Sequence, residues 1–122
     1  MNWTLELVVL PVTNVDRARD FYEAIGFNTD HDHTVSDEIR FVQMTPPGSA
    51  CSIAFGRGLT PAEPGSVRGV QVCVDNIETA HAGLTAAGAE PGEVQHLPWG
   101  DFVYFTDPDG NAWSVQRFEH AA

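Results

Sequence analysis

The chain has 122 residues, 43% of them hydrophobic and 19% charged, a composition typical of one folded domain with its own core. Six basic and 17 acidic residues give a formal net charge of −11, which argues against nucleic-acid binding because that function needs a cationic footprint. No apolar run reaches the roughly 18 residues that span a bilayer, and residues 1–6 lack the features of a signal peptide, so we expect a cytoplasmic protein without a membrane partner.

The first half of the chain predicts one helix flanked by strands. Alternating apolar residues indicate a strand over residues 5–12, and Asn14 then stands where a helix N-cap belongs. The helix is expected to run to about Ile25 and to end at Gly26, because glycine readily adopts the left-handed conformation that follows many helices. Three further strands are expected over residues 27–33, 39–45 and 50–56, and a turn rich in Pro and Gly, residues 45–49, joins the last two.

The second half predicts the same order of elements after a linker over residues 58–66, which is rich in Gly, Pro and Thr. A strand over residues 70–74 precedes a helix that is expected to run to about Ala87 and to end at Gly88. Either Asn76 as the N-cap or a capping box of Asp75 and Glu78 would begin this helix. Strands are then expected over residues 89–96, 101–106 and 112–118, and the turn 107–111 joins the last two.

The two halves are copies of one unit at a constant offset of 62 residues. Ten identities without a gap fall between positions 7 and 53 of the first copy, among them Asn14 with Asn76 and Gly26 with Gly88. Several of these residues have backbone roles, so the repeat is structural. Each unit is a βαβββ module whose helix cannot cover a sheet alone, so we expect both modules to share a core in one α+β domain. The predicted modules are residues 1–57 and 67–122.

This double βαβββ order, the segment from Val12 to Tyr22 and the closing turn Asp107-Pro108-Asp109-Gly110-Asn111 resemble the vicinal oxygen chelate superfamily. That superfamily contains glyoxalases, bleomycin-resistance proteins and extradiol dioxygenases. The resemblance covers nearly the whole chain. It implies curved, cup-shaped mixed sheets with the helices on the outer face, and a homodimer whose cavities are lined by both subunits.

In the enzymes of this superfamily a divalent metal lies inside the cup, held by the first and last strands of each module. By the resemblance, the corresponding positions in this chain are Leu7, Ser52, Gly69 and Ser114. None of the four is a normal metal ligand, since divalent metals prefer imidazole, carboxylate or thiolate groups. The resemblance therefore implies a protein without a metal or other cofactor, closest in character to the members that bind antibiotics without altering them.

Two other groups of residues suggest different chemistry. His31 and His33 are two residues apart on an expected strand and share a face, and with Asp37 or Glu38 they could form a displaced metal site. The same spacing fits two histidines on a face exposed to solvent. The serines at positions 52 and 114 would act as nucleophiles only with a histidine base within reach, and the sequence around them supplies none.

Aromatic residues cluster in the last third of the chain, and aromatic surface is common in small-molecule sites. Trp113 and Phe105 are expected in the core, because Trp113 adjoins Ser114 and must point to the opposite face of its strand. Trp99 lies in a loop with Pro and Gly, where it is expected to act as a lid or stacking platform. The candidate ligand-binding residues, most of them placed on the concave face by strand alternation, are Leu7, Val9, His33, Phe41, Gln43, Ser52, Gln71, Trp99, Tyr104, Ser114 and Gln116.

These features predict a metal-independent binding protein of the drug-resistance type, which sequesters an aromatic or cationic antibiotic or metabolite in the cavities of a homodimer. No catalytic residue is predicted. The alternative is a metal-dependent glyoxalase- or dioxygenase-type lyase or oxidoreductase with ligands displaced to residues such as His31, His33 or Glu38. A third class is a metal-free isomerase or hydrolase that uses cup residues such as Gln71.

Overall fold

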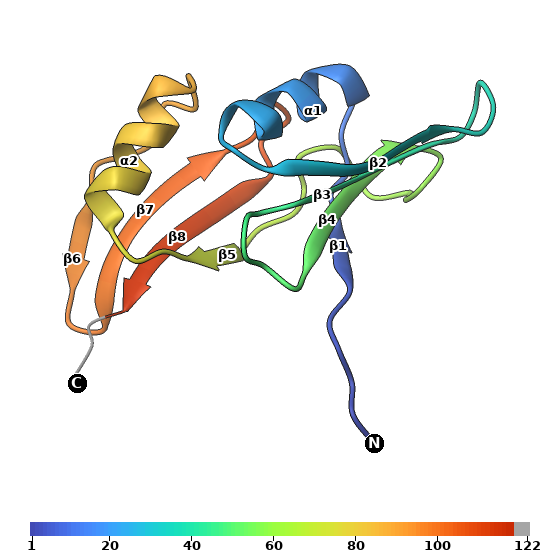
Figure 1. The fold of residues 1–122 in the computed structure, drawn as a ribbon. Coiled ribbons are helices and arrows are strands. Elements are labelled where there is room, and N and C mark those ends of the chain that lie inside the picture. Colours follow the sequence, from blue (N-terminus) through green and yellow to red (C-terminus); the bar gives the residue numbers. More distant parts are fainter. Residues whose placement is uncertain (119–122) are drawn as a thin grey trace.

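The structure is a computed structural model that describes residues 1–118 of the chain. Two βαβββ modules follow each other, as predicted (Figure 1). The first module contains β1 (Leu7–Val9), α1 (Val15–Ala24), β2 (Asn28–Thr34), β3 (Arg40–Thr45) and β4 (Ser52–Arg57). The second contains β5 (Val70–Cys73), α2 (Ile77–Ala86), β6 (Gln95–Leu97), β7 (Gly100–Thr106) and β8 (Ala112–Phe118). The end of the predicted second module, residues 119–122, lies outside the described residues.

Each module forms its own open, mixed, four-stranded sheet. The strand orders are β1-β4-β3-β2 and β5-β8-β7-β6. In both sheets the first strand of the module runs parallel to the last, and the other neighbours are antiparallel. Figure 1 shows α1 and α2 on the same side of the molecule, and each helix contacts the sheet of its own module. The predicted α+β fold, with curved sheets and helices on one face, is confirmed.

Both helices begin and end where the sequence predicts. The side chains of Asn14 and Asn76 each accept a 3.0 Å hydrogen bond from the backbone N–H three residues later, so Asn76 and not the capping box begins α2. Gly26 and Gly88 follow the helices with φ of 103° and 82°, a backbone conformation that favours glycine. Within residues 1–118 no helix is long and apolar enough to cross a membrane.

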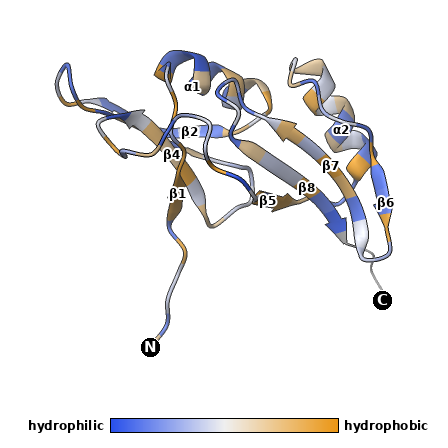
Figure 2. Ribbon diagram, turned by 180° about the vertical axis from the view of Figure 1, so that it is seen from behind, coloured by the Kyte–Doolittle hydropathy of each residue, from blue (hydrophilic) through white to orange (hydrophobic). Residues whose placement is uncertain are grey.

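One core joins the two modules, and α1 lies at its centre. The ring of Tyr22, on α1, lies 5.8 Å from the ring of Phe55 in the first sheet and 5.7 Å from that of Trp113 in the second. Trp113 and Phe105 stack at 5.7 Å, and both are buried as predicted. Figure 2 shows apolar segments on the strands that the helices cover. The structure thus has the shared core that is expected when neither helix can cover a sheet alone.

The turn at residues 107–111 holds the second module against the first through buried polar contacts. Asp107, 4% exposed, accepts a 2.8 Å hydrogen bond from the hydroxyl of Tyr22. Asn111 Nδ2 donates to the backbone carbonyl of Pro11 at 2.9 Å. Burial, followed by the nearby charge of Asp107, raises the pKa of Tyr22, so the phenol stays protonated and donates its hydrogen.

Several strands are shorter than predicted. β1 covers only Leu7–Val9, although the N–H of Leu10 extends the ladder by donating to the carbonyl of Ala54 at 2.8 Å. β6 covers only Gln95–Leu97 of a strand expected to begin at residue 89. Pro91 has no N–H to donate and Glu90 has φ of 52°, so the regular ladder does not extend ahead of β6, where the N–H of Gly92 still donates to the carbonyl of Tyr104 on β7 at 3.0 Å.

Candidate functional site

The face of the first sheet opposite α1 forms the first cup, which we define by Leu7, Val9, Phe41, Gln43 and Ser52. The parallel pair β1–β4 places Leu7 beside Ser52 and Val9 beside Ala54. The antiparallel pair β3–β4 places Gln43 beside Ala54. Intervening residues such as Val42 and Ile53 turn to the core, as alternation requires. The sequence therefore placed these five side chains on the correct face.

A chain of hydrogen bonds occupies the polar groups of the first cup. The amide of Gln43 donates to the hydroxyl of Ser52 at 3.3 Å, and the hydroxyls of Ser52 and Thr45 lie 2.6 Å apart. The hydroxyl of Thr45 donates to the carboxylate of Asp30, so the hydroxyl of Ser52 must donate to Thr45. The hydroxyl proton of Ser52 is thus committed to Thr45, and Ser52 hydrogen-bonds no histidine within residues 1–118. This arrangement does not activate a nucleophile.

The second cup is the corresponding face of the second sheet, defined by Gln71, Tyr104, Ser114 and Gln116. The hydroxyl of Ser114 donates to the side-chain oxygen of Gln71 at 3.0 Å, and the amide of Gln71 donates to that of Gln116 at 2.6 Å. The amide of Gln116 reaches the backbone carbonyl of Trp99 at 3.4 Å. These contacts join β5, β8 and the β6–β7 turn in one uncharged network.

Two exposed aromatic side chains accompany the second cup. Tyr104 pairs with Ser114 across β7–β8, is 43% exposed and stacks on Phe102 with ring centroids 6.0 Å apart. Trp99 is 63% exposed at the β6–β7 turn, and its backbone is tied to the cup by Gln116. Phe102 is 6% exposed and holds the ring of Tyr104 at an interplanar angle of 6°, so the exposed aromatic surface beside this cup belongs to Tyr104 and Trp99.

Strand register in the second module departs from the 62-residue repeat. Leu7 lies beside Ser52 in the first module, so the repeat places Gly69 beside Ser114, but the residue beside Ser114 is Gln71. Gly69 precedes β5, with φ of 85°. The slip is two residues, which keeps the same face toward the cup. Gln71 therefore replaces Gly69 as the fourth member of the set that faces the cups.

These four positions do not fit the metal centre of the superfamily's enzymes. Leu7 has no donor atom, Ser52 and Ser114 offer neutral hydroxyls, and Gln71 offers an amide oxygen that Ser114 already uses. Divalent metals prefer imidazole, carboxylate or thiolate ligands. In the part of the chain that the structure describes, no group of three His, Cys, Asp or Glu side chains is arranged to hold a metal ion.

The histidine pair on β2 lies at the rim of the first cup. His31 pairs with Gln43 and His33 with Phe41, so both histidines point to the cup side, as their spacing predicts. Their rings stack with centroids 5.8 Å apart. Both are exposed, and Glu38 lies in the connection between β2 and β3. The described residues supply no third ligand to this pair.

The predicted site residues thus fall into two sets on separate sheets, and no hydrogen bond or strand pair within residues 1–118 joins the sets. Sequence reasoning missed Thr45 and Asp30 in the first cup and Phe102 in the second. Thr45 alternates with Gln43 on β3, so the same rule that selected Gln43 would have found it.

Comparison with known proteins identifies the class. Residues 4–115 match the Glyoxalase/Bleomycin resistance protein/Dioxygenase superfamily, and the chain belongs to this superfamily. The solved structure of TnmS3, an antibiotic binding protein from Streptomyces sp. CB03234, is 28% identical, with a TM-score of 0.87 over 97% of this chain and 98% of that chain. A glyoxalase/bleomycin resistance protein from the same strain is 30% identical, with a TM-score of 0.81 over 93% and 99% of the two chains. The uncharacterized protein YetH of Bacillus subtilis (strain 168) is 24% identical over 113 residues, which are 90% of this chain and 94% of YetH.

Proposed function

We propose that this protein binds a planar, largely apolar small molecule in its cups without a metal ion, and sequesters it unchanged. The ligand class is an aromatic antibiotic or metabolite, neutral or cationic, and the site of action is the cytoplasm. The observation that carries the proposal is the pairing of neutral residues across the first and last strands of each module, Leu7 with Ser52 and Gln71 with Ser114. By the resemblance, these are the strands that carry the metal ligands in the superfamily's enzymes.

The free hydrogen-bond donor in the second cup favours a ligand that carries oxygen acceptors. The amide of Gln71 uses one N–H within the network, and because Gln71 is exposed its second N–H is left for a ligand, whereas Gln116 is buried at 4% exposure. The phenol of Tyr104 makes no hydrogen bond among residues 1–118, and its ring, 43% exposed, is held in place by stacking on the buried ring of Phe102. A planar ring system that carries carbonyl or hydroxyl groups suits this mixture of surfaces.

Similarity to TnmS3 supports the binding function. That protein is an antibiotic binding protein, and the similarity extends over 97% of this chain. Because one fold can host many functions, the similarity adds weight only together with the cup chemistry.

We propose further that a homodimer completes the cavity. The two cups belong to different sheets of one chain, and β1 and β5 each have one unpaired edge among the described strands. Trp3 and Leu5 are 86% and 69% exposed, and a second subunit would remove such apolar surface from water. In this arrangement the first cup of one subunit meets the second cup of its partner.

The alternative function is a metal-dependent lyase or dioxygenase whose ligands include His31 and His33. The observation in its favour is the stacked pair on the cup side of β2, 5.8 Å between centroids. It requires further ligands from outside the described residues of one chain. A His33→Ala change that removed both bound metal and turnover would favour this alternative.

A thermal-shift screen of chelator-treated protein against aromatic antibiotics and metabolites tests the proposal. A ligand at about 100 times its dissociation constant adds roughly 2.7 kcal/mol of stability. Mass spectrometry of the incubated mixture should recover the ligand chemically unchanged. Formation of a product, or a shift that appears only after metal is restored, would contradict the proposal.

A further inference from the structure

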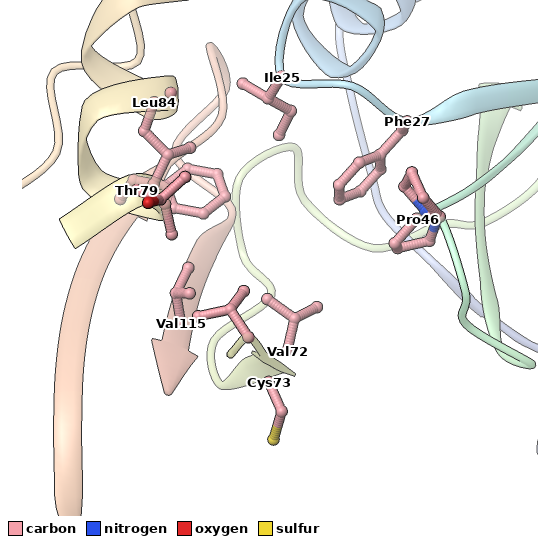
Figure 3. Close-up of a pocket in the computed structure, with 13 residues that line it drawn as sticks. Ile25, Phe27, Pro46, Val72, Cys73, Thr79, Leu84 and Val115 are labelled. Carbon is pink, nitrogen blue, oxygen red and sulfur yellow. The ribbon is translucent and has the colours of Figure 1, made fainter. Parts of the chain in front are cut away.

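A separate apolar cleft lies on the helix side of the molecule, away from both cups. It has a volume of about 330 Å³ and is bounded by α2, the core-facing side of β5 and β8, and the turn at residues 45–49. Figure 3 shows its walls, formed by Ile25, Phe27 and Pro46 of the first module and Val72, Leu84 and Val115 of the second. The cleft is therefore a feature of the junction between the modules.

The position related to this cleft by the repeat is filled. There the turn at residues 107–111 packs against α1, where Asp107 accepts a hydrogen bond from Tyr22 at 2.8 Å. Asp109 accepts a second one from the hydroxyl of Thr13 at 2.7 Å. Polar contacts and aromatic side chains thus close this half of the molecule.

α2 lacks the residues that close the other half. Gly83 and Leu84 stand at the positions that Phe21 and Tyr22 occupy in α1, so two aromatic rings are absent. Within residues 1–118 the turn at 45–49 makes no hydrogen bond to α2. A Cβ atom built on Gly83 would meet no heavy atom within 4 Å. The cleft exists because the second copy lacks both the rings and the polar contacts of the first.

The lining of the cleft selects a neutral, apolar occupant. Among the described residues no charged side chain lines it, and the polar groups are the hydroxyl of Thr79 and the thiol of Cys73. Figure 3 shows the sulfur of Cys73 directed away from the cleft. A buried ion would find no counter-charge here, and its desolvation would oppose binding. The volume lies near the lower end of the range for small-molecule sites.

We propose that this cleft is a second small-molecule site, distinct from the cups, which takes a compact neutral hydrophobic compound of roughly two fused rings. The hydroxyl of Thr79 supplies its one hydrogen-bonding contact at the mouth. The site does not depend on the proposed function of the cups, because the two are on opposite faces of β5 and β8.

Titration of indole into isotope-labelled protein, followed by NMR, tests the proposal. Saturable shifts are expected at the methyl groups of Val72, Leu84 and Val115. Gly83→Phe restores the residue of the first module and fills the cleft, so these shifts should be lost. Gly83→Ala should keep them, and Ala82→Phe, which adds the same ring at a neighbouring exposed position of α2, is the matched control.

Gly83→Leu provides a second filling variant if Gly83→Phe does not fold, and thermal unfolding establishes that each variant is folded. No saturable shift in the wild type, or the same shifts in a folded filling variant, would overturn the proposal. So would a wild type that binds no indole but is a dimer that Gly83→Phe dissociates, because a second copy would then occupy the cleft. Cup ligands found in the thermal-shift screen should bind Gly83→Phe as they bind the wild type, which separates failure at this site from failure at the cups.

Discussion

Ser114 lies beside Gln71 across the parallel β5–β8 pair, and its hydroxyl donates a 3.0 Å hydrogen bond to the side-chain oxygen of Gln71. Two neutral side chains that satisfy each other therefore form the centre of the second cup. Gln71 offers one further amide N–H to a ligand, because its other N–H donates to Gln116, and neither residue offers an anionic or imidazole ligand to a metal. The predictions on binding follow from this pair and from the aromatic residues around it.

Gln71→Leu should weaken the binding of a cup ligand by about tenfold, because the ligand loses an amide donor worth about 1 kcal/mol or more. Gln71→Leu also leaves the side-chain oxygen of Gln116, which is 4% exposed, without its 2.6 Å donor, so the free energy of unfolding should fall by about 1–3 kcal/mol. Calorimetric titration and thermal unfolding measure the two effects. Glu78→Gln, on the first turn of α2, is the control and should change neither; equal affinity in Gln71→Leu and wild type would exclude the proposed role.

Trp99→Ala should lower affinity for a planar ligand by up to about tenfold, since an aromatic pair contributes about 0.5–1.5 kcal/mol. Trp99→Phe should retain most of the affinity. Because Trp99 is 63% exposed, neither change should lower stability appreciably. Val35→Ala, at a position 71% exposed between β2 and β3, serves as control. An unaltered dissociation constant in Trp99→Ala would show that Trp99 does not contact the ligand.

Tyr22→Phe should cost about 1–3 kcal/mol of stability at neutral pH. The change removes the donor to Asp107 and the acceptor of the 3.0 Å hydrogen bond from the indole of Trp113. Tyr104→Phe, at an exposed position, should cost less than about 0.5 kcal/mol in the same denaturant titration. Equal stability of the two variants would contradict a structural role for the Tyr22 hydroxyl.

Stability should also fall above about pH 10 in the wild type. The folded-state pKa of Tyr22 is raised by burial, so above the unfolded-state value only the unfolded chain loses this proton. The predicted slope is up to about 1.4 kcal/mol per pH unit. Tyr22→Phe should lack this part of the alkaline slope, and identical slopes in both proteins would refute the assignment.

Asp32 should stabilise the fold above about pH 4 and lose that effect at lower pH. Hydrogen bonds from Arg40, and after it Arg19, lower the pKa of Asp32 from 3.8 to about 2. The lowered folded-state pKa means that the contribution disappears as pH falls from about 4 to about 2. Asp32→Asn should lose on the order of 1–2 kcal/mol at pH 7 and show a flatter acid profile. An acid profile that matches the wild type would contradict this.

The sequence repeat was sufficient to predict both helices and the shared core, because helix limits depend on local signals. Asn14 and Asn76 cap, Gly26 and Gly88 terminate, and the residues between them have the same spacing in both modules. Strand ends were less predictable. The end of a strand depends on pairing with its neighbour in the sheet. The positive φ of Glu90, which precedes the late start of β6 at Gln95, has no strong local signal in the sequence.

The face of each strand was predictable, but the register was not. Alternation placed Trp113 in the core and Ser114 in the cup, and both positions are confirmed. The repeat placed Gly69 beside Ser114, whereas the structure has Gln71 there. Alternation cannot distinguish the two registers, because a shift of two residues leaves the same side chains of β5 facing the core. The helix-side cleft was also not predicted. The missing side chain at Gly83 leaves a cleft only because the turn at residues 45–49 lies opposite α2, and the sequence does not show that these two segments meet.

Calorimetric titration of the strongest ligand from the screen into chelator-treated protein, repeated after Zn²⁺ or Mn²⁺ is added, tests metal-independent binding in the cups most directly. We predict the same dissociation constant with and without metal. Binding that appears only with metal, or that becomes tighter by about tenfold, equivalent to about 1.4 kcal/mol, would contradict it.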